Sequence, residues 1–352
     1  MDKYRIKFTA NYFDDDGNFT IPGYDISRLL DDPRIEVGVI YNRAHVDAAE
    51  IVDVDALIAT PTAAAITADS FPPDCRLAVI ARVGVGYENV DVPACNANGV
   101  VITIAADAVR RPTAAGTMAL ILAATTRLLT KDRLTRLGPD GWGQKNAHPG
   151  MGLEGRTLGV VGLGNVGAEV VRLATPFDLK FIAYDPYVDR DAAAALGVRM
   201  VDDLDELMAQ SDIVALHCLV TDETRGMIDA GRLALMKPTA YLINAARGPV
   251  VDQAALTEVL AAGRIAGAGL DVFDPEPVAA DDPLLKLDNV VLSGHGMNWT
   301  DQLMVGFGKT NVDAVLAVMQ GRAPRSVVNS EVLGEPLWQA KAAALRAMFG
   351  EG

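Results

Sequence analysis

The chain of 352 residues contains little cysteine and little histidine. Its three cysteines, Cys75, Cys95 and Cys218, are odd in number and widely spaced, and none belongs to a C-x-x-C pair. We therefore predict free thiols in a reducing, cytoplasmic compartment, because disulfide frameworks need paired cysteines and an oxidising environment. The four histidines form no local metal motif either, so we expect no metal site.

Long apolar runs and positive charge are also scarce. The longest apolar run near a predicted helix, 118–124, is far shorter than the roughly 20 residues that a membrane-spanning helix needs. Residues 1–8 contain no uninterrupted apolar segment of the kind found in secretory signals. The formal net charge of −15 argues against nucleic acid or an anionic membrane as a partner, since both are bound by basic surfaces.

Short apolar runs at strand length alternate with helix-like segments along the whole chain, which is typical of parallel α/β sheets. We expect strands at 5–9, 35–41, 56–59, 77–81, 158–161, 181–185, 212–216, 240–244, 267–272 and 290–293. We expect helices at 113–129, 302–320 and 336–349. The predicted fold is α/β with two Rossmann-like domains: a flavodoxin-like substrate domain of 1–108, completed by 300–352, and a doubly wound domain of 109–299.

A glycine-rich turn lies between a predicted strand and a predicted helix in the second of these domains. Gly162, Gly164 and Gly167 have the G-x-G-x-x-G spacing, in which the three glycines allow a tight turn, close approach to a pyrophosphate and close helix packing. The amides of Asn165 and Val166 would face the phosphates at the positive end of the helix. A glycine turn alone is a weak signal, because it also occurs for purely structural reasons.

An acidic residue at the end of the next strand strengthens this interpretation. Asp185 lies 18 residues after Gly167, where a carboxylate can accept hydrogen bonds from the adenosine ribose hydroxyls. The same charge would repel the 2′-phosphate of NADP. The sequence therefore predicts a dinucleotide site that prefers NAD.

A second glycine-rich turn, Arg82-Val-Gly-Val-Gly, follows a predicted strand of the first domain. Ligands of α/β sheets collect beyond the carboxyl ends of the strands. We therefore expect the amides of Val85 and Gly86 to bind a substrate carboxylate.

Three further strand ends carry chemically useful side chains. Arg247 could hold a carboxylate with its guanidinium fork, Asp271 and Glu276 follow the next strand, and His295 follows the last strand between two glycines. Taken singly, a strand-end histidine is more often structural, and an arginine before glycine is usually solvated. Together they supply the arginine, carboxylate and histidine that carbonyl reduction needs.

From Arg82 to Leu333 the sequence resembles the D-isomer-specific 2-hydroxyacid dehydrogenases. The segments that carry the resemblance are Arg82-Val-Gly-Val-Gly, the turn from Gly162 to Gly167, Ser211-Asp-Ile-Val, Met236-Lys-Pro, Ile243-Asn-Ala-Ala-Arg-Gly, Gly269-Leu-Asp-Val-Phe, Pro283-Leu-Leu and Asn289-Val-Val-Leu-Ser-Gly-His. The resemblance implies reversible, NAD-linked interconversion of a 2-oxo acid and a D-2-hydroxy acid, and a homodimer with contacts at the apolar helix beginning near Thr113.

The same resemblance assigns roles to individual residues. It implies that Arg247, Glu276 and His295 are catalytic, with His295 exchanging a proton with the substrate oxygen and Glu276 favouring the charged form of the histidine. Arg247 would also bind the substrate carboxylate. The implied nicotinamide-side residues are Leu219, Ala245 and Asp271.

The sequence departs from the family pattern at three positions: Leu219 replaces a usual proline, Ser293-Gly294 replaces Thr-Pro, and Ala115 replaces a glutamate of the hinge helix. These departures leave the particular acid and the physiological direction open. The alternatives are a hydroxypyruvate or glyoxylate reductase, a short phosphoglycerate dehydrogenase, or a non-enzymatic NAD-sensing corepressor. A formate dehydrogenase is disfavoured, because that group has glutamine in place of Glu276.

Two consecutive arginines precede a proline at the predicted start of the helix of 113–129. Cations are disfavoured there, so we hypothesise that Arg110 and Arg111 bind a second acidic group on the substrate. The alternative is that they are solvated or paired with an acidic neighbour.

Overall fold

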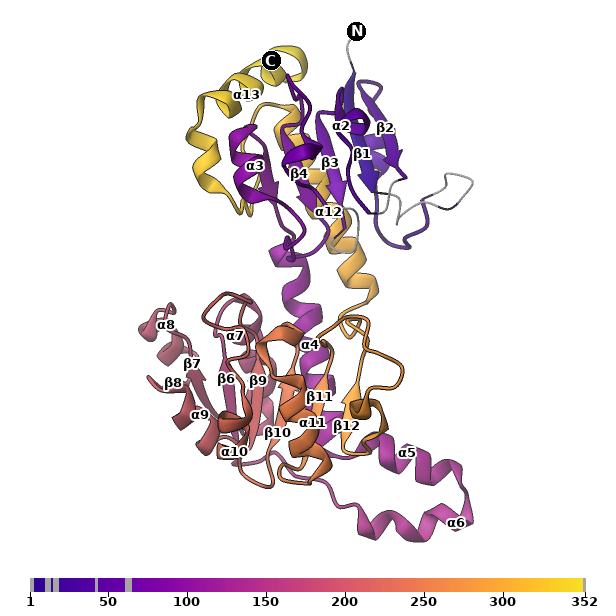
Figure 1. Ribbon diagram of the computed structural model, residues 1–352, viewed down its shortest axis with the longest axis vertical. Helices are drawn as coiled ribbons and strands as arrows, with labels where there is room; N and C mark the ends of the chain where they lie inside the picture. The colour runs from indigo at the N-terminus through magenta and orange to yellow at the C-terminus, as the bar shows by residue number, and fades with distance from the viewer. Residues whose placement is uncertain (1–2, 10–13, 15–18, 42–43, 61–64, 351–352) are drawn as a thin grey trace. The chain divides into compact units, whose positions relative to one another are not determined.

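The computed structural model describes residues 3–9, 14, 19–41, 44–60 and 65–350 (Figure 1). The chain divides into two compact units. Unit 1 comprises Met1–Val109 and Trp299–Gly352, and unit 2 comprises Arg110–Asn298.

Unit 1 is built on a five-stranded parallel sheet. Its strands are β1 (Tyr4–Thr9), β2 (Ile35–Ile40), β3 (Ala56–Ala59), β4 (Val79–Arg82) and β5 (Val101–Thr103). They lie in the order β2-β1-β3-β4-β5, which is the flavodoxin-like arrangement that the sequence predicted. Because β3 and β4 are buried on both faces, all of β3 and the first three residues of β4 appear in the sequence as continuous apolar runs.

Helices cover both faces of this sheet, and two of them come from the end of the chain. The described helices of unit 1 are α1 (Ser27–Leu30), α2 (Ala48–Ile51), η2 (Ala68–Ser70), α3 (Val92–Ala97), the first turn of α4 (Ala106–Thr125), α12 (Asp301–Met319), η7 (Ser330–Gly334) and α13 (Pro336–Phe349). Phe307 and Val315 of α12 and Trp338 of α13 enter the same core as β1. The C-terminal segment therefore completes the core of unit 1.

Unit 2 contains a seven-stranded parallel sheet. Its strands are β6 (Thr157–Val161), β7 (Lys180–Tyr184), β8 (Val198–Met200), β9 (Ile213–Leu216), β10 (Tyr241–Asn244), β11 (Gly267–Leu270) and β12 (Val290–Leu292). They lie in the order β12-β11-β10-β9-β6-β7-β8. The strand order reverses between β6 and β9, as in a doubly wound nucleotide-binding sheet, where ligands bind beyond the carboxyl ends of the strands. The α/β fold class is therefore confirmed.

The helices of unit 2 connect these strands. Those described are the rest of α4, α5 (Leu128–Arg136), α6 (Pro139–Trp142), η3 (Gly143–Ala147), α7 (Asn165–Ala174), η4 (Thr175–Phe177), α8 (Arg190–Ala195), α9 (Leu204–Gln210), α10 (Ala230–Leu235), η5 (Gly248–Val250), α11 (Gln253–Ala261) and η6 (Pro283–Lys286). No single helix among the residues described here is long and apolar enough to cross a membrane; only α4 and α5 taken together across their 61° bend reach the required length and apolar composition.

The predicted helix of 113–129 is corrected at both ends. Helix α4 begins at Ala106 and ends at Thr125, and Arg127, with φ of 54°, separates it from α5. Pro112 therefore lies inside the helix, where its ring removes one backbone hydrogen bond, and does not mark the first turn. Residues Ala114, Met118 and Ile121 of α4 are buried in the core of unit 2. This face of α4 is therefore part of the core, and the dimer contact expected at the helix near Thr113 stays a prediction.

Candidate active site

The glycine turn of unit 2 has a shape that fits a dinucleotide. Gly162 has φ of +88°, and a Cβ there would lie 2.8 Å from the backbone nitrogen of Cys218. A Cβ on Gly167 would lie 2.1 Å from the carbonyl oxygen of Gly162, whereas a Cβ on Gly164 would meet no atom within 4 Å. The first and third glycines are therefore required by the turn and by helix packing, and the second leaves open space. This space lies beside the start of α7, where Asn165 and Val166 form the first turn.

Asp185 lies beside this turn, directly after β7. Its Oδ2 accepts a hydrogen bond from the amide of Leu163 at 2.9 Å, and its Oδ1 accepts one from the amide of Tyr187 at 2.9 Å. Each carboxylate oxygen keeps a further acceptor site, since a carboxylate can accept about four hydrogen bonds. The residues present thus fit NAD, with a cradle for the pyrophosphate and a fixed carboxylate for the ribose.

His295 and Glu276 form a direct contact. The Nδ1 of His295 lies 2.8 Å from the Oε2 of Glu276, and the Oε1 of Glu276 accepts the amide of Phe273 at 2.9 Å. Because a carboxylate only accepts, Nδ1 carries the proton in this pair and Nε2 is left for a substrate. The side chains of His295 and Glu276 are 47% and 35% exposed, so both can be reached.

The backbone around His295 is held by Asp271, which is buried at the end of β11. The Asp271 carboxylate accepts hydrogen bonds from the amides of Gly296 at 3.0 Å and Met297 at 3.1 Å. The amide of His295 donates to the Asp271 carbonyl at 2.7 Å, and His295 itself has φ of 52°. Asp271 therefore fixes the unusual turn that presents the imidazole.

Arg247 follows β10, and a buried asparagine shapes its turn. The Oδ1 of Asn244 accepts the amide of Ala246 at 3.1 Å, and its Nδ2 donates to the carbonyl of Arg247 at 3.0 Å. Strands β10, β11 and β12 are neighbours in the sheet. Arg247, Glu276 and His295 therefore follow three adjacent carboxyl ends. Sequence reasoning missed Asn244, although its place between a strand and a catalytic candidate is typical of an Asx turn.

In unit 1 the turn after β4 presents backbone amides. No hydrogen bond from the amide of Val85 or Gly86 is present among the residues described. The preceding residue, Gly84, has φ of +123°, and its carbonyl accepts a hydrogen bond from the amide of Ala105 at 2.8 Å. The loop is therefore anchored while two donors are left for a ligand.

The comparison with known proteins agrees with this geometry. The family model for the NAD-binding domain of D-isomer specific 2-hydroxyacid dehydrogenases matches residues 118–296, about half of the chain. The chain belongs to this family. It is 39% identical over 287 residues to a glyoxylate reductase of Korarchaeum cryptofilum, a match that covers 80% of this chain and 85% of the relative.

Two further relatives extend the comparison. A D-3-phosphoglycerate dehydrogenase of Methanocaldococcus jannaschii is 38% identical over 280 residues, which are 80% of this chain and 52% of that relative, so the chain spans about half of its length. The crystal structure of holo D-mandelate dehydrogenase from Rhodotorula graminis superposes with a TM-score of 0.80 at 26% identity, covering 93% of this chain and 98% of the other.

The protein is an NAD-dependent D-2-hydroxyacid dehydrogenase, an enzyme that interconverts a 2-oxo acid and a D-2-hydroxy acid. The predicted family, reaction class and cofactor are thereby confirmed. Nothing in these comparisons supports the non-enzymatic corepressor alternative.

Two of the dehydrogenase's nicotinamide-side candidates lie in loops that follow strands of unit 2. Leu219, after β9, is 68% exposed, and its carbonyl accepts the Thr224 hydroxyl at 2.6 Å. Ala245 lies directly after β10, in the turn that Asn244 shapes. Because the Leu219 side chain is exposed, leucine in place of the family's usual proline does not disturb the core.

The hypothesis about the paired arginines loses its main premise. Because α4 begins at Ala106, Arg110 and Arg111 are not at the positive end of the helix. Arg111 is paired with Glu169 of α7 at 2.6 Å, and Arg172 contacts the same carboxylate at 3.2 Å. These hydrogen bonds, from Arg111 first, hold the pKa of Glu169 below its usual value. Arg111 therefore has an acidic neighbour, as the alternative interpretation required.

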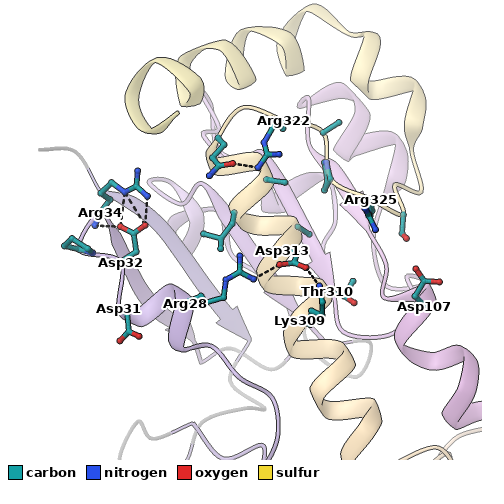
Figure 2. Close-up of a pocket in the computed structure, with 18 residues that line it drawn as sticks. Arg28, Asp31, Asp32, Arg34, Asp107, Lys309, Thr310, Asp313, Arg322 and Arg325 are labelled. Carbon is teal, nitrogen blue, oxygen red and sulfur yellow. Dashed lines mark hydrogen bonds and ion pairs between the residues drawn. The ribbon is translucent and has the colours of Figure 1, made fainter. Parts of the chain in front are cut away.

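A wide groove of about 1150 Å³ in unit 1 is lined in part by charged residues, and several of these pair with one another (Figure 2). Arg28 and Lys309 both contact Asp313, at 2.5 and 2.6 Å, and Arg34 contacts Asp32 at 2.6 Å. None of the residues that line it belongs to the candidate catalytic set of the dehydrogenase. We therefore interpret it as a solvated surface groove.

Proposed function

We propose that Arg247, Glu276 and His295 carry out the catalytic step. The observation that carries the proposal is the 2.8 Å contact between His295 Nδ1 and Glu276 Oε2, which leaves Nε2 to give a proton to the substrate oxygen during reduction. The Arg247 guanidinium would bind the substrate carboxylate and polarise the adjacent carbonyl. When bound, the nicotinamide supplies or accepts the hydride.

We propose the following residues as contacts for NAD: Gly162, Gly164, Asn165, Val166, Gly167, Asp185, Leu219, Ala245 and Asp271. The open space at Gly164 and the fixed carboxylate of Asp185 support this assignment. The Asp185 carboxylate would disfavour NADP, because its charge lies where a 2′-phosphate would have to bind. NADH should therefore bind more tightly than NADPH, and Asp185→Ala should narrow that difference.

We propose a small 2-oxo acid, glyoxylate or hydroxypyruvate, as the substrate class. The free amides of Val85 and Gly86 would bind its carboxylate, with unit 1 acting as the substrate domain and unit 2 as the NAD domain. The similarity to a glyoxylate reductase over 85% of that relative's length supports this class. A phosphoglycerate dehydrogenase is the second candidate, supported by a relative of which the chain spans about half.

The decisive experiment is NADH consumption against glyoxylate, hydroxypyruvate, pyruvate, 2-oxoglutarate and 3-phosphohydroxypyruvate. The expected result is turnover of at least one of the first two with formation of a D-configured product where the product is chiral. His295→Gln is the matched control, which should bind NADH normally and lose turnover by a factor of about 10² to 10⁴. Normal turnover by His295→Gln would contradict the proposed site.

We further propose a homodimer in which helices α5 and α6 contact a second copy. Leu128, Leu129, Leu137 and Trp142 on and beside these helices are each more than half exposed, and α5 and α6 extend from the sheet of unit 2 (Figure 1). Grouped exposed apolar side chains are typical of subunit contacts. Light scattering should give a dimer mass for the wild type and a monomer mass for Leu137→Glu with Trp142→Glu. The three free cysteines support the cytoplasmic compartment expected from the sequence.

A further inference from the structure

Arg82 is a fully buried arginine at the end of β4, directly before the loop that carries the free amides. Its side chain has 0% exposure, which is rare for an arginine. The Nε group donates a hydrogen bond to the carbonyl of Gly86 at 3.2 Å, and Nη2 donates one to the Oδ1 of Asn89 at 2.6 Å. The guanidinium therefore lies inside the loop and holds two points of it.

The backbone of Arg82 is fixed from another side by a buried polar network. Its carbonyl accepts the Nδ2 of Asn311 at 3.0 Å, and the Oδ1 of Asn311 accepts the hydroxyl of Tyr24 at 2.9 Å. Asn311 lies in α12 with 0% exposure. The segment of Tyr24 and helix α12 thus hold the backbone at the point where β4 ends and the loop begins.

These contacts set the directions of the loop amides. In a trans peptide the carbonyl and the following N–H point in opposite directions. The Gly84 carbonyl is held by the amide of Ala105, which directs the Val85 N–H away from Ala105. The Gly86 carbonyl accepts a hydrogen bond from Nε of Arg82, which fixes the peptide plane that follows Gly86. Glycine could otherwise adopt many conformations, and the Arg82 contact restricts that freedom at the position that carries the second amide.

We propose that Arg82 is a positioning residue for substrate binding. It keeps the amides of Val85 and Gly86 oriented as a carboxylate site and adds a positive charge beneath them in a region of low dielectric. This inference rests on the proposed function of those two amides. It predicts that losing Arg82 weakens binding of the 2-oxo acid, raises KM far more than it lowers kcat, and leaves NADH affinity unchanged.

The test compares Arg82→Met and Arg82→Lys with Arg76→Met. The control arginine precedes β4 at the opposite end of the strand, where it pairs with Asp55 at 3.0 Å. We expect KM for the 2-oxo acid to rise about tenfold or more in Arg82→Met, because a charge and two hydrogen bonds are lost. Arg82→Lys should recover part of this rise. Arg76→Met should lower the melting temperature without changing KM, which separates positioning from stability alone.

Binding of oxamate to the NADH-saturated enzyme provides a readout that does not need turnover. Weaker oxamate binding by Arg82→Met than by wild type supports the inference; equal affinity, or no binding by wild type, overturns it. If Arg82→Met does not fold, Asn89→Ala, which removes one of the two contacts, should raise KM by a smaller factor, and an unchanged KM there counts against the proposal. Failure of the wild type to reduce any 2-oxo acid would instead refute the proposed function, while the oxamate comparison still decides the role of Arg82.

Discussion

Replacing Glu276 with glutamine should damage the enzyme more than removing the side chain. In the native pair, Oε1 of Glu276 accepts the Phe273 amide at 2.9 Å and Oε2 faces Nδ1 of His295 at 2.8 Å. A glutamine has one oxygen, and the Phe273 amide requires an acceptor. The side-chain NH2 of the glutamine would therefore face Nδ1 of His295, so two N–H donors would meet unless Nδ1 lost its proton. This arrangement would disfavour the imidazolium that the proposed reduction step needs.

The magnitude follows from the strength of the lost contact. A charge-assisted hydrogen bond contributes about 1.5–3 kcal/mol, and partial exposure of both side chains reduces this toward the lower end. Glu276→Ala, in which water can replace the carboxylate, should therefore lower kcat about tenfold. Glu276→Gln adds a clash between two N–H donors, and we expect a loss of about 100-fold, within the range for general acid catalysis.

The assay is the steady-state reduction rate at saturating NADH, with NADH affinity measured separately as a control for folding. In a His295→Gln background, neither substitution at Glu276 should cause a further large loss, because Glu276 acts through the imidazole. The reasoning fails if Glu276→Gln is no worse than Glu276→Ala, or if the losses at Glu276 and His295 multiply.

Three further predictions address the cofactor turn, acid stability and the paired arginines. Gly164→Ala should weaken NADH binding at unchanged melting temperature, whereas Gly162→Ala should cost about 1–3 kcal/mol of stability, because a Cβ there is both strained and 2.8 Å from a backbone nitrogen. Burial lowers the pKa of His217 to about 4, below its unfolded value near 6.5. The free energy of unfolding should therefore fall by up to about 3 kcal/mol as the pH drops from 6.5 to 4, because the unfolded chain binds the proton first. Urea titrations at several pH values should show this dependence in the wild type and not in His217→Phe. Arg111→Ala should lower the free energy of unfolding by about 1 kcal/mol, because it removes the ion pair with Glu169. The ratio of kcat/KM for dicarboxylate to monocarboxylate substrates should stay unchanged. A changed ratio would support the hypothesis that Arg111 binds the substrate.

The elements that the sequence predicted best are those with long, fully buried patterns. Strand β3 and, up to Asn244, strand β10 are apolar runs because helices cover both faces of a parallel sheet. Strands β5 and β8 were missed, although β12, which is equally short at three residues, was predicted from its apolar run. The start of α4 was placed too late because Pro112 suggested a first turn, and tertiary burial of the helix outweighs the cost of an internal proline.

The candidate site was predictable where its side chains follow strand ends and unpredictable where they are supported from afar. Glu276 and His295 could be brought together in advance, because neighbouring parallel strands end at one edge of the sheet. The buried state of Arg82 could not be predicted, because its surroundings include segments far along the chain, such as that of Asn311, 229 residues later, which bonds the Arg82 carbonyl. An arginine in a glycine-rich loop looks solvent-exposed until the segment that covers it is known.

A chain with net charge −15 repels an anionic substrate at long range, but the groups that bind the substrate act over much shorter distances. At physiological salt, charges more than about 8–10 Å apart in water are largely screened, so the overall charge mainly affects the rate of encounter. In the proposed site, the backbone amides of Val85 and Gly86 and the buried guanidinium of Arg82 would act at close range. On this proposal, affinity for a carboxylate would be determined by a few fixed donors, which composition cannot reveal, and the acidic surface would remain available for solubility.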